Sequence, residues 1–276
     1  MQKEITIGNV TLGNDCPLVL IAGPDSLESY ERTFPIVSEV ARITEELRIP
    51  YILKASYDKA NRTSVNSFRG VGIIEGLKLL QRFKDELNVP VTTDVHTPEE
   101  ATEAGRVVDL IQIPALLSRQ TDLLVAAGKT GKPVNVKKGQ FMAPHDIQNV
   151  IEKVESAGNT SVSVTERGFS FGYGNLVADM RSLEIMKRTG APVIFDAAHS
   201  VQYPSGHGTT SGGDRSFIAP LARAAVAVGI AGLFLEVYGD PDSAPVDGKN
   251  SLALKDLGSL LRTLMAIDVA TKAATT

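Results

Sequence analysis

Eight short apolar runs recur along the chain, and their number constrains the fold more than any other feature. They are rich in Val, Ile and Leu, and most are followed by a segment with helical periodicity. The runs are LVLIAG (18–23), YILKAS (51–56), VPVTTDV (89–95), LIQIPA (110–115), PVNVKKG (133–139), SVSVTERG (161–168), APVIFDAAHS (191–200) and GLFLEVY (232–238). This alternation is typical of a parallel sheet with crossover helices.

Eight strands of this kind, buried on both faces, predict an α/β protein of the (β/α)8 or TIM-barrel fold. Amphipathic segments such as 29–48 and 70–88 would supply the outer helices, and the 276 residues suit a barrel, which usually has ~250. A doubly wound open sheet is the alternative. However, no GxGxxG motif follows the first run, and polar residues end nearly all eight runs rather than one switch point.

The N-terminal segment KEITIGNVTLGND alternates apolar and polar residues around the pair Gly8 and Asn9. This pattern predicts a β-hairpin within residues 1–16 that covers the N-terminal end of the barrel, the alternative being a frayed terminus. The chain shows no internal repeat, low-complexity segment or long Pro/Ser linker. We therefore expect residues 1–276 to form a single domain.

Charge and cysteine content narrow the function and the compartment. The net charge is −4, from 28 basic and 32 acidic residues, and no basic block suggests a nucleic-acid or membrane partner. The single cysteine, Cys16, and the absence of an apolar signal segment favour a cytoplasmic protein. No run of about 18 apolar residues predicts a membrane span. Local clusters of cations in this acidic chain suggest a small anionic ligand.

Cations end three separate predicted strands, at Lys54, Lys138 and Arg167. In a TIM barrel the carboxyl ends of the strands form the active site, so these cations would repel one another unless a multiply charged anion compensates them. A phosphate or carboxylate ligand follows, and the run 62–64 (Arg-Thr-Ser) could hold a second phosphate. The alternative is that the lysines lie on the surface with only their aliphatic stems covered.

A second group of residues suits a metal ion. His199 follows the seventh run, Glu236 lies in the eighth, Asp247 comes eleven residues later, and Asp25 follows the first. These runs are neighbours in a closed barrel, so one imidazole and three carboxylates could converge on Mn²⁺, Fe²⁺ or Zn²⁺. Alternatively, His199 is a hydrogen-bonded core histidine and Asp25 a helix N-cap.

With these motifs the sequence resembles the 3-deoxy-D-manno-octulosonate 8-phosphate synthases, a family that condenses phosphoenolpyruvate with arabinose 5-phosphate. The resemblance covers almost the whole chain, in the segments KASYDKANRTS, SFRG, TDVH, IQIPA, RQTDLL, NVKKGQ, ERGFSFGYGNLVADMRS, PVIFDAAHSVQ and GLFLEVY. KANRTS separates this family from the related heptulosonate synthases, which carry KPRTS. The resemblance implies synthesis of a lipopolysaccharide precursor, with release of inorganic phosphate, by a homotetramer.

The resemblance also implies a role for individual residues. Lys54 would lie between the two substrates, and Arg119 would reach the pentose phosphate from a neighbouring subunit. The residues implied to bind phosphoenolpyruvate are Ser56, Lys59, Gln112, Lys138 and Arg167. Those implied to bind arabinose 5-phosphate are Asn61, Arg62, Thr63, Ser64 and Asp94. The candidates for moving protons are Lys54, Asp94, His199 and Asp247.

The chain departs from the family pattern at Asp25, where members that use a metal carry Cys and members that do not carry Asn. A carboxylate keeps the negative charge of a thiolate but is a harder donor, which favours harder ions than Zn²⁺; loss of the metal is the other outcome. EVYGDP replaces EVHPDP, and GHGTTSGGDR changes the loop after the seventh run. Both changes lie near the expected pocket.

Three other functions are compatible with these residues. One is a related phosphoenolpyruvate-dependent synthase that uses another aldehyde. Another is a non-catalytic barrel that binds phosphosugars, with Asp25 marking the loss of activity. The last is an aldolase with Lys54 as a Schiff-base lysine, although so many phosphate-binding charges favour an electrostatic role for this amine.

Overall fold

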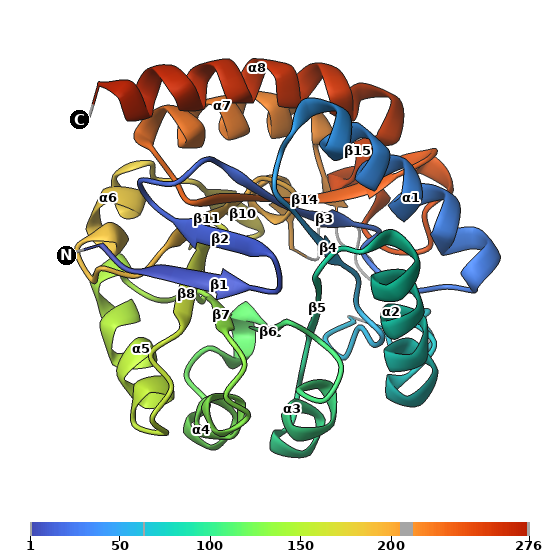
Figure 1. Cartoon of the computed structure of the whole chain (residues 1–276), viewed down its shortest axis with the longest axis horizontal. Helices are drawn as coiled ribbons and strands as arrows, with labels where there is room; N and C mark the ends of the chain where they lie inside the picture. The colour runs from blue at the N-terminus through green and yellow to red at the C-terminus, as the bar shows by residue number, and fades with distance from the viewer. Residues whose placement is uncertain (1, 63, 205–211, 275–276) are drawn as a thin grey trace.

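The computed structural model describes residues 2–62, 64–204 and 212–274, and its centre is a closed barrel of parallel strands (Figure 1). The barrel strands are β3 (Val19–Gly23), β4 (Tyr51–Lys54), β5 (Val91–Asp94), β6 (Leu110–Ile113), β7 (Val134–Lys137), β8 (Val162–Glu166), β11 (Val193–Asp196) and β14 (Gly232–Tyr238). Each strand pairs with the next, and β14 pairs with both β11 and β3. This closure confirms the predicted (β/α)8 barrel and excludes the open sheet.

Helices surround the barrel, one after each barrel strand (Figure 1). They are α1 (Tyr30–Leu47), α2 (Ile73–Leu87), α3 (Pro98–Ala104), α4 (Thr121–Lys129), α5 (Ile147–Glu155), α6 (Arg181–Lys187), α7 (Ile218–Val228) and α8 (Leu254–Ala273). Their apolar faces pack on the outer faces of the strands and form the larger hydrophobic core. The local sequence determines where helix α3 begins. Thr97 is its N-cap and accepts a hydrogen bond from the Glu100 N–H, and Pro98 occupies the first turn.

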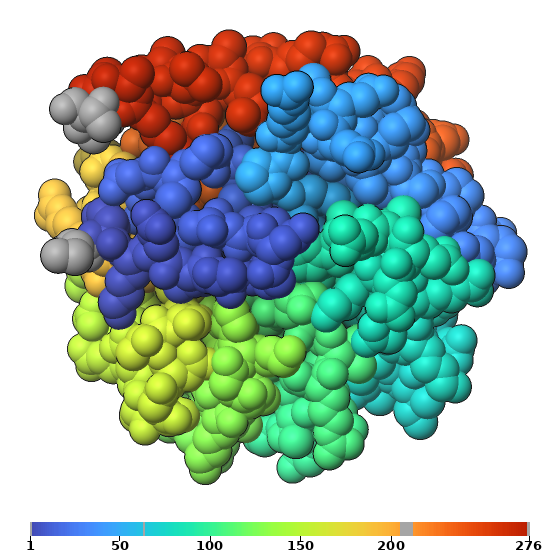
Figure 2. Space-filling view, viewed as in Figure 1, coloured from blue at the N-terminus to red at the C-terminus, as the bar shows by residue number. Residues whose placement is uncertain are grey.

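The strands β1 (Glu4–Ile7) and β2 (Val10–Gly13) form the predicted N-terminal hairpin. Gly8 begins the turn with a φ of +58°, a conformation that glycine adopts without strain. The hairpin side chains pack in a second hydrophobic cluster with barrel residues near the amino ends of the strands, including Val19, Leu110 and Ala231. Figure 2 shows its atoms, in dark blue, covering the middle of this face. The hairpin therefore closes the end of the barrel opposite the strands' carboxyl ends.

The inner face of the barrel changes from apolar to polar along each strand. Successive side chains of a strand point to opposite faces, so residues two apart share a face. Ile52, Leu110, Ile194 and Phe234 belong to the cluster beneath the hairpin. Two residues further along the same strands come, in the same order, Lys54, Gln112, Asp196 and Glu236, all buried. The fold thus places polar side chains at the carboxyl end of the barrel.

Shorter elements extend the loops at the carboxyl end. They are β9 (Phe169–Phe171) paired with β10 (Asn175–Val177), β12 (Gln202–Tyr203) paired with β13 (Gly212–Gly213), and β15 (Leu252–Ala253), which pairs with β14 beyond the barrel. The 3₁₀ turn η3 (His199–Val201) follows β11. Most of the altered segment GHGTTSGGDR falls at 205–211, outside the described residues. The single-domain assignment stays a prediction.

Candidate active site

A cavity of about 250 Å³ lies at the carboxyl ends of the strands. It receives side chains from most of the barrel strands or the loops that follow them, as the sequence predicted for a TIM barrel. Its lining residues are Lys54, Lys59, Ala60, Asn61, Arg62, Asp94, His96, Gln112, Pro114, Ala115, Leu116, Leu117, Lys137, Gln140, Arg167, His199, Gln202, Glu236, Val246 and Asp247. Most of the predicted site residues are among them, so the fold brings these residues together.

Lys54 and Asp94 form the centre of a buried polar group at the ends of β4 and β5. The Lys54 ammonium lies 3.2 Å from a carboxylate oxygen of Asp94 and donates a hydrogen bond of 2.8 Å to the Ser56 hydroxyl. Ser56 in turn donates to the same Asp94 carboxylate. Burial disfavours ionisation of Asp94, but the charge of Lys54 and the hydrogen bond from His96 outweigh it and hold the pKa of Asp94 well below its ordinary value. Ser56 therefore lies behind the cavity wall and orients two residues that form it.

Lys138 is not at the cavity, which corrects the sequence-based assignment; Lys137 lines it instead. The Lys138 ammonium is fully buried, 3.5 Å from a carboxylate oxygen of Glu166 and 3.6 Å from the centre of the Phe169 ring. The Lys137 ammonium lies 2.6 Å from a carboxylate oxygen of Asp196. The two lysines are adjacent, so the alternation of the strand sends them to opposite faces. Lys137 shares its face of the strand with Asn135, which accepts hydrogen bonds inside the barrel. The alternation of side chains along the strand could have predicted this direction from the sequence.

Two arginines present donors that no protein group satisfies. Among the described residues, the Nη1 of Arg167 and the Nε of Arg62 are buried without a hydrogen-bond partner. Arg167 donates 3.0 Å to Gln202, whose amide donates 3.1 Å to Asp247, and Arg62 lies 3.7 Å from the same aspartate. Burial lowers the pKa of Arg167 despite nearby carboxylates. Buried guanidinium donors of this kind need an anionic partner, as a bound phosphate would be.

Ser64 and Arg119, which the resemblance also implies to bind substrate, are not among the residues that line the cavity. Ser64 accepts a hydrogen bond of 3.3 Å from the Asn66 N–H within its own loop. Arg119 is exposed after β6, and its carbonyl accepts a hydrogen bond of 3.0 Å from Lys153. Thr63 lies outside the described residues. The contribution of these three residues to a site stays a prediction.

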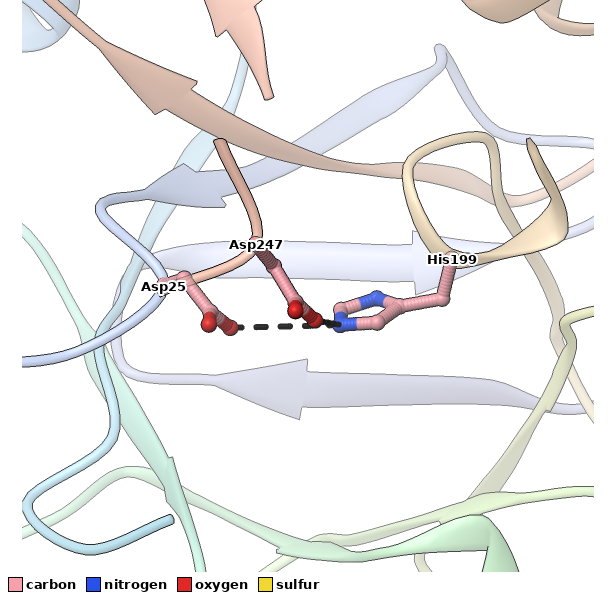
Figure 3. Close-up of side chains that lie close together, drawn as sticks. All are labelled: Asp25, His199 and Asp247. Carbon is pink, nitrogen blue, oxygen red and sulfur yellow. Dashed lines mark ion pairs between the residues drawn. The ribbon is translucent and has the colours of Figure 1, made fainter. Parts of the chain in front are cut away.

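The four predicted metal ligands converge around one nitrogen of His199. Its Nε2 lies 3.9 Å from a carboxylate oxygen of Asp25, 3.9 Å from Glu236 and 4.0 Å from Asp247. Figure 3 shows the carboxylates of Asp25 and Asp247 directed toward the His199 ring. Ligand atoms of Asp25, His199 and Asp247 all lie within 4.8 Å of one another, which suits a shared ion. Asp25 is not the N-cap of α1, because Ser29 occupies that position.

The carboxylates of this cluster carry more negative charge than the protein compensates. Burial and the charge of Asp25 raise the pKa of Glu236 well above its ordinary value, and the same two causes raise the pKa of Asp247. Asp25 has a lowered pKa because the Lys59 ammonium contacts it and outweighs its burial. Both oxygens of Glu236 and one of Asp25 are buried without a hydrogen-bond partner. A divalent cation would satisfy these oxygens, so the donor set fits a metal ion.

Asp196 orients His199 from behind. It accepts hydrogen bonds of 2.8 Å from both the backbone N–H and the ring Nδ1 of His199, and it also accepts the bond from Lys137. An ionised carboxylate can only accept hydrogen bonds, so Nδ1 carries the proton. The unprotonated Nε2 then faces Asp25, Glu236 and Asp247 with a lone pair that could bind a metal ion. Burial lowers the pKa of His199, which favours this neutral form.

Sequence reasoning missed several lining residues besides Lys137. His96 and Gln140 lie in loops that follow barrel strands, and Gln202 lies in the two-residue strand β12, so no periodicity marks the direction of these side chains. Pro114 to Leu117 form an apolar side of the cavity around the turn η1 (Ala115–Leu117). The segments TDVH and IQIPA contained some of these residues, but only the fold shows which side chains face inward.

Comparisons with known proteins identify relatives of this chain. A sequence profile of the DAHP synthetase I family matches residues 2–273. Proteins named 2-dehydro-3-deoxyphosphooctonate aldolase are similar over nearly the full length. That of Geobacter metallireducens is 56% identical over 272 residues, 99% of this chain and 100% of the relative. That of Geotalea uraniireducens is 55% identical with the same coverage, and that of Brucella anthropi is 52% identical over 97% of this chain and 96% of the relative. In the described part of the chain, no helix has the length and apolar character that crossing a membrane requires.

Proposed function

The chain belongs to the DAHP synthetase I family, and we propose that it condenses phosphoenolpyruvate with D-arabinose 5-phosphate and water. The products are 3-deoxy-D-manno-octulosonate 8-phosphate and inorganic phosphate, the reaction of the relatives named 2-dehydro-3-deoxyphosphooctonate aldolase. This transferase activity supplies a precursor of lipopolysaccharide. A synthase for another aldehyde or a non-catalytic barrel is not favoured, because the relatives at 52–56% identity share one name.

The observation that carries the proposal is the group of cations lining one cavity. Lys54 and Lys137 end two different strands, Arg167 follows a third, and Lys59 and Arg62 come from the loop after β4. Phosphoenolpyruvate carries a phosphate and a carboxylate, and the pentose carries a second phosphate. Charged donors in a shared, largely buried cavity can compensate these anions far better than donors on a surface can.

The assignment of residues to substrates is the one that the family resemblance implies, with Lys137 in place of Lys138 because Lys137 lines the cavity. We assign Lys59, Gln112, Lys137 and Arg167 to phosphoenolpyruvate, and Asn61, Arg62 and Asp94 to the pentose phosphate. The resemblance implies that Lys54 lies between the two substrates; its buried ammonium contacts Asp94, which is assigned to the pentose phosphate. Holding C3 of phosphoenolpyruvate against the aldehyde carbon can supply roughly 7–11 kcal/mol of the activation barrier.

The chemical steps then need only proton transfers from the chain. C3 of phosphoenolpyruvate attacks the aldehyde carbon, and the former carbonyl oxygen takes up a proton, for which the buried Lys54 ammonium is the candidate donor. Positive character at C2 is captured by water, which loses a proton to a nearby base, with Asp247 and His199 as candidates. The C2–O bond to the phosphate then breaks and the C2 hydroxyl passes its remaining proton to the departing phosphate, so inorganic phosphate leaves and C2 becomes the ketone of the product.

Release of inorganic phosphate from phosphoenolpyruvate tests the proposal. We expect release that depends on arabinose 5-phosphate, with formation of an eight-carbon keto acid, and little release with erythrose 4-phosphate or without a sugar. Faster release with another aldehyde would assign the chain to a related synthase. Binding of both substrates without turnover would support the non-catalytic alternative. Trapping of Lys54 with borohydride and substrate would indicate a Schiff base instead.

We further propose that one divalent metal ion is held by Asp25, His199, Glu236 and Asp247. The free Nε2 of His199 and the unsatisfied carboxylate oxygens support this set. An ion there would polarise the aldehyde oxygen or activate a water molecule. Three carboxylates without a thiolate favour Mn²⁺ or Fe²⁺ over Zn²⁺. Lys59 contacts Asp25, so an ion would share this carboxylate with the lysine.

Metal removal tests this site directly. After prolonged chelation we expect activity to fall at least 10-fold, to return best with Mn²⁺, and metal analysis to find close to one ion per chain. Asp25→Cys adds a soft donor at the same place, so it should shift the binding preference toward Zn²⁺. Full activity of the chelated protein without any added ion would contradict the proposal.

We also propose that the enzyme is a homotetramer in the cytoplasm and that Arg119 of one subunit reaches the site of another. The exposure of Arg119 and of the nearby Leu116 and Phe141 supports an assembly through this face. Sedimentation of the purified chain tests the subunit number. Arg119→Ala should raise the KM for arabinose 5-phosphate about 10-fold or more. An unchanged KM would contradict this role of Arg119.

A further inference from the structure

Glu100 on α3 links a row of ionisable residues that ends at the cavity. One of its carboxylate oxygens accepts a hydrogen bond of 2.7 Å from the Tyr57 hydroxyl and one of 2.9 Å from the backbone N–H of His96. The same oxygen lies 2.9 Å from the ring Nδ1 of His96. On the other side of the ring, the Nε2 of His96 lies 3.3 Å from the carboxylate of Asp94. His96 itself lines the cavity.

The two carboxylates determine the protons on the His96 ring. An ionised carboxylate only accepts hydrogen bonds, so the ring nitrogen facing Glu100 must donate. A neutral ring would then turn the lone pair of Nε2 toward the second carboxylate, Asp94, which is repulsive. With a proton on each nitrogen, both contacts become charge-assisted hydrogen bonds. The geometry therefore selects the imidazolium.

Charges on the neighbouring elements are consistent with a charged His96. Burial opposes its ionisation, but the hydrogen bond to Asp94 and the charges of Asp94 and Glu100 outweigh burial and raise the pKa of His96 above its ordinary value. The cations Lys54 and Lys59 affect His96 indirectly, because they stabilise the charge of Asp94.

The groups beyond Glu100 add little net charge. Arg69 is paired with Asp58, so the two nearly cancel. Burial and the bond to Glu100 raise the pKa of Tyr57, which stays a neutral donor.

The Glu100 side chain is not the N-cap of α3. Thr97 caps α3 through the backbone N–H of Glu100, and Pro98 fills the first turn. The Glu100 carboxylate instead points away from the helix, to Tyr57 and His96. Its neighbour Glu99 is exposed and makes no contact with His96, which provides a matched control in the same turn.

We propose that Glu100 is a positioning residue that holds His96 as an imidazolium, with the Nε2–H directed at Asp94. This inference rests on the proposed function, because Asp94 is assigned to the pentose phosphate. The Nε2–H and Lys54 then fix the Asp94 carboxylate from two sides at the cavity wall. Loss of the His96 proton removes one of these two contacts, so binding of the pentose phosphate weakens as the pH rises.

The test compares Glu100→Gln with Glu99→Gln in the full-length protein. Titration of ¹⁵N-labelled histidine by NMR gives the pH at which His96 loses its proton, and His96→Asn identifies its signal. We expect Glu100→Gln to move this midpoint to lower pH and Glu99→Gln to leave it unchanged. Between the two midpoints, the KM of Glu100→Gln for arabinose 5-phosphate should be about 10-fold higher than that of the unmodified enzyme, because only the variant has lost the charge-assisted hydrogen bond from His96 to Asp94. Well below both midpoints, the two KM values should agree.

A second variant covers the case in which Glu100→Gln does not fold. Tyr57→Phe removes one donor from Glu100 but keeps its charge, so the His96 midpoint should stay the same or rise. A midpoint that falls in Tyr57→Phe, or one that does not move in a folded Glu100→Gln, overturns the inference. The NMR titration needs no turnover. A chain inactive with arabinose 5-phosphate would therefore contradict the proposed function and leave the His96 result to decide the inference.

Discussion

The two lysines that end β7 and begin the next loop have different surroundings although they are adjacent. Lys137 lies inside the barrel, with its ammonium 3.6 Å from the centre of the Phe234 ring and in contact with Asp196. Lys138 lies outside, with Glu166. At the residue scale, one step along a strand therefore separates a position that lines the cavity from one that does not.

Methionine at each lysine position distinguishes these roles. Lys137→Met should lower kcat/KM for phosphoenolpyruvate about 100-fold or more, because a charged donor to the substrate is lost. Lys138→Met should leave the KM within about 2-fold but lower the free energy of unfolding by about 3–5 kcal/mol, since Glu166 stays buried without its cation. Steady-state kinetics and urea denaturation measure the two effects. The reverse pattern would restore Lys138 as the substrate ligand.

Arg62 offers a test of substrate assignment at the same scale. Its guanidinium faces the cavity beside Asp247 with a buried Nε that lacks a partner. Arg62→Ala should raise the KM for arabinose 5-phosphate about 100-fold and that for phosphoenolpyruvate much less, because only the first substrate has a phosphate assigned to this loop. Initial rates with each substrate varied in turn give both constants. Equal effects on the two KM values would refute the assignment.

At the element scale, the N-terminal hairpin and the site occupy opposite ends of the same strands. Ile7 and Leu12 of the hairpin are fully buried against the apolar inner residues of the barrel. The polar inner residues begin one inward-facing position further along the strands. The hairpin therefore packs against the barrel core without lining the cavity.

Truncation of one hairpin side chain tests this division. Leu12→Ala should lower the free energy of unfolding by about 2–5 kcal/mol, the usual effect of a cavity in a core, and leave both KM values within about 2-fold. Thr11→Ala, at the exposed neighbouring position, should change the stability by less than about 0.5 kcal/mol. Denaturant unfolding and steady-state kinetics supply the readouts. A large rise in either KM for Leu12→Ala would show that the hairpin also shapes the site.

At the scale of the whole molecule, buried charges are concentrated at the carboxyl end of the barrel. Burial opposes ionisation of Asp196, but its contacts with His199 and the charge of Lys137 outweigh it and lower the pKa of this carboxyl below its ordinary value. Asp94 is shifted in the same direction. Carboxyls with a lower pKa in the folded state than in the unfolded state stabilise the fold above the ordinary aspartate pKa of about 3.9.

Acid should therefore destabilise the protein through these groups. As the pH falls below about 4, the unfolded chain takes up protons that the folded chain excludes, so the melting temperature should fall steeply. Asp196→Asn should melt lower at pH 7, because Lys137 and His199 lose their partner, but its melting temperature should fall less between pH 5 and pH 3. Thermal unfolding across this pH range measures the slope. Equal slopes for the two proteins would contradict this origin of the acid sensitivity.

The sequence by itself determined the barrel, the hairpin and the end at which the chemistry lies. Apolar runs of strand length alternating with helical periodicity leave few other ways to bury so much apolar surface, and parallel strands bring their carboxyl ends together. The resemblance in its motifs also identified the reaction. These features are local patterns or depend only on strand order.

Only the tertiary structure decided which side chains share the cavity. It replaced Lys138 with Lys137, placed Ser56 behind the wall, and brought Glu100 and His96 beside Asp94. The direction of a side chain at the end of a strand depends on the residue at which the alternation of the strand stops and on the path of the following loop. Neighbouring elements determine both. Contacts between residues from different loops have no periodicity in the sequence, because they arise only when the barrel closes.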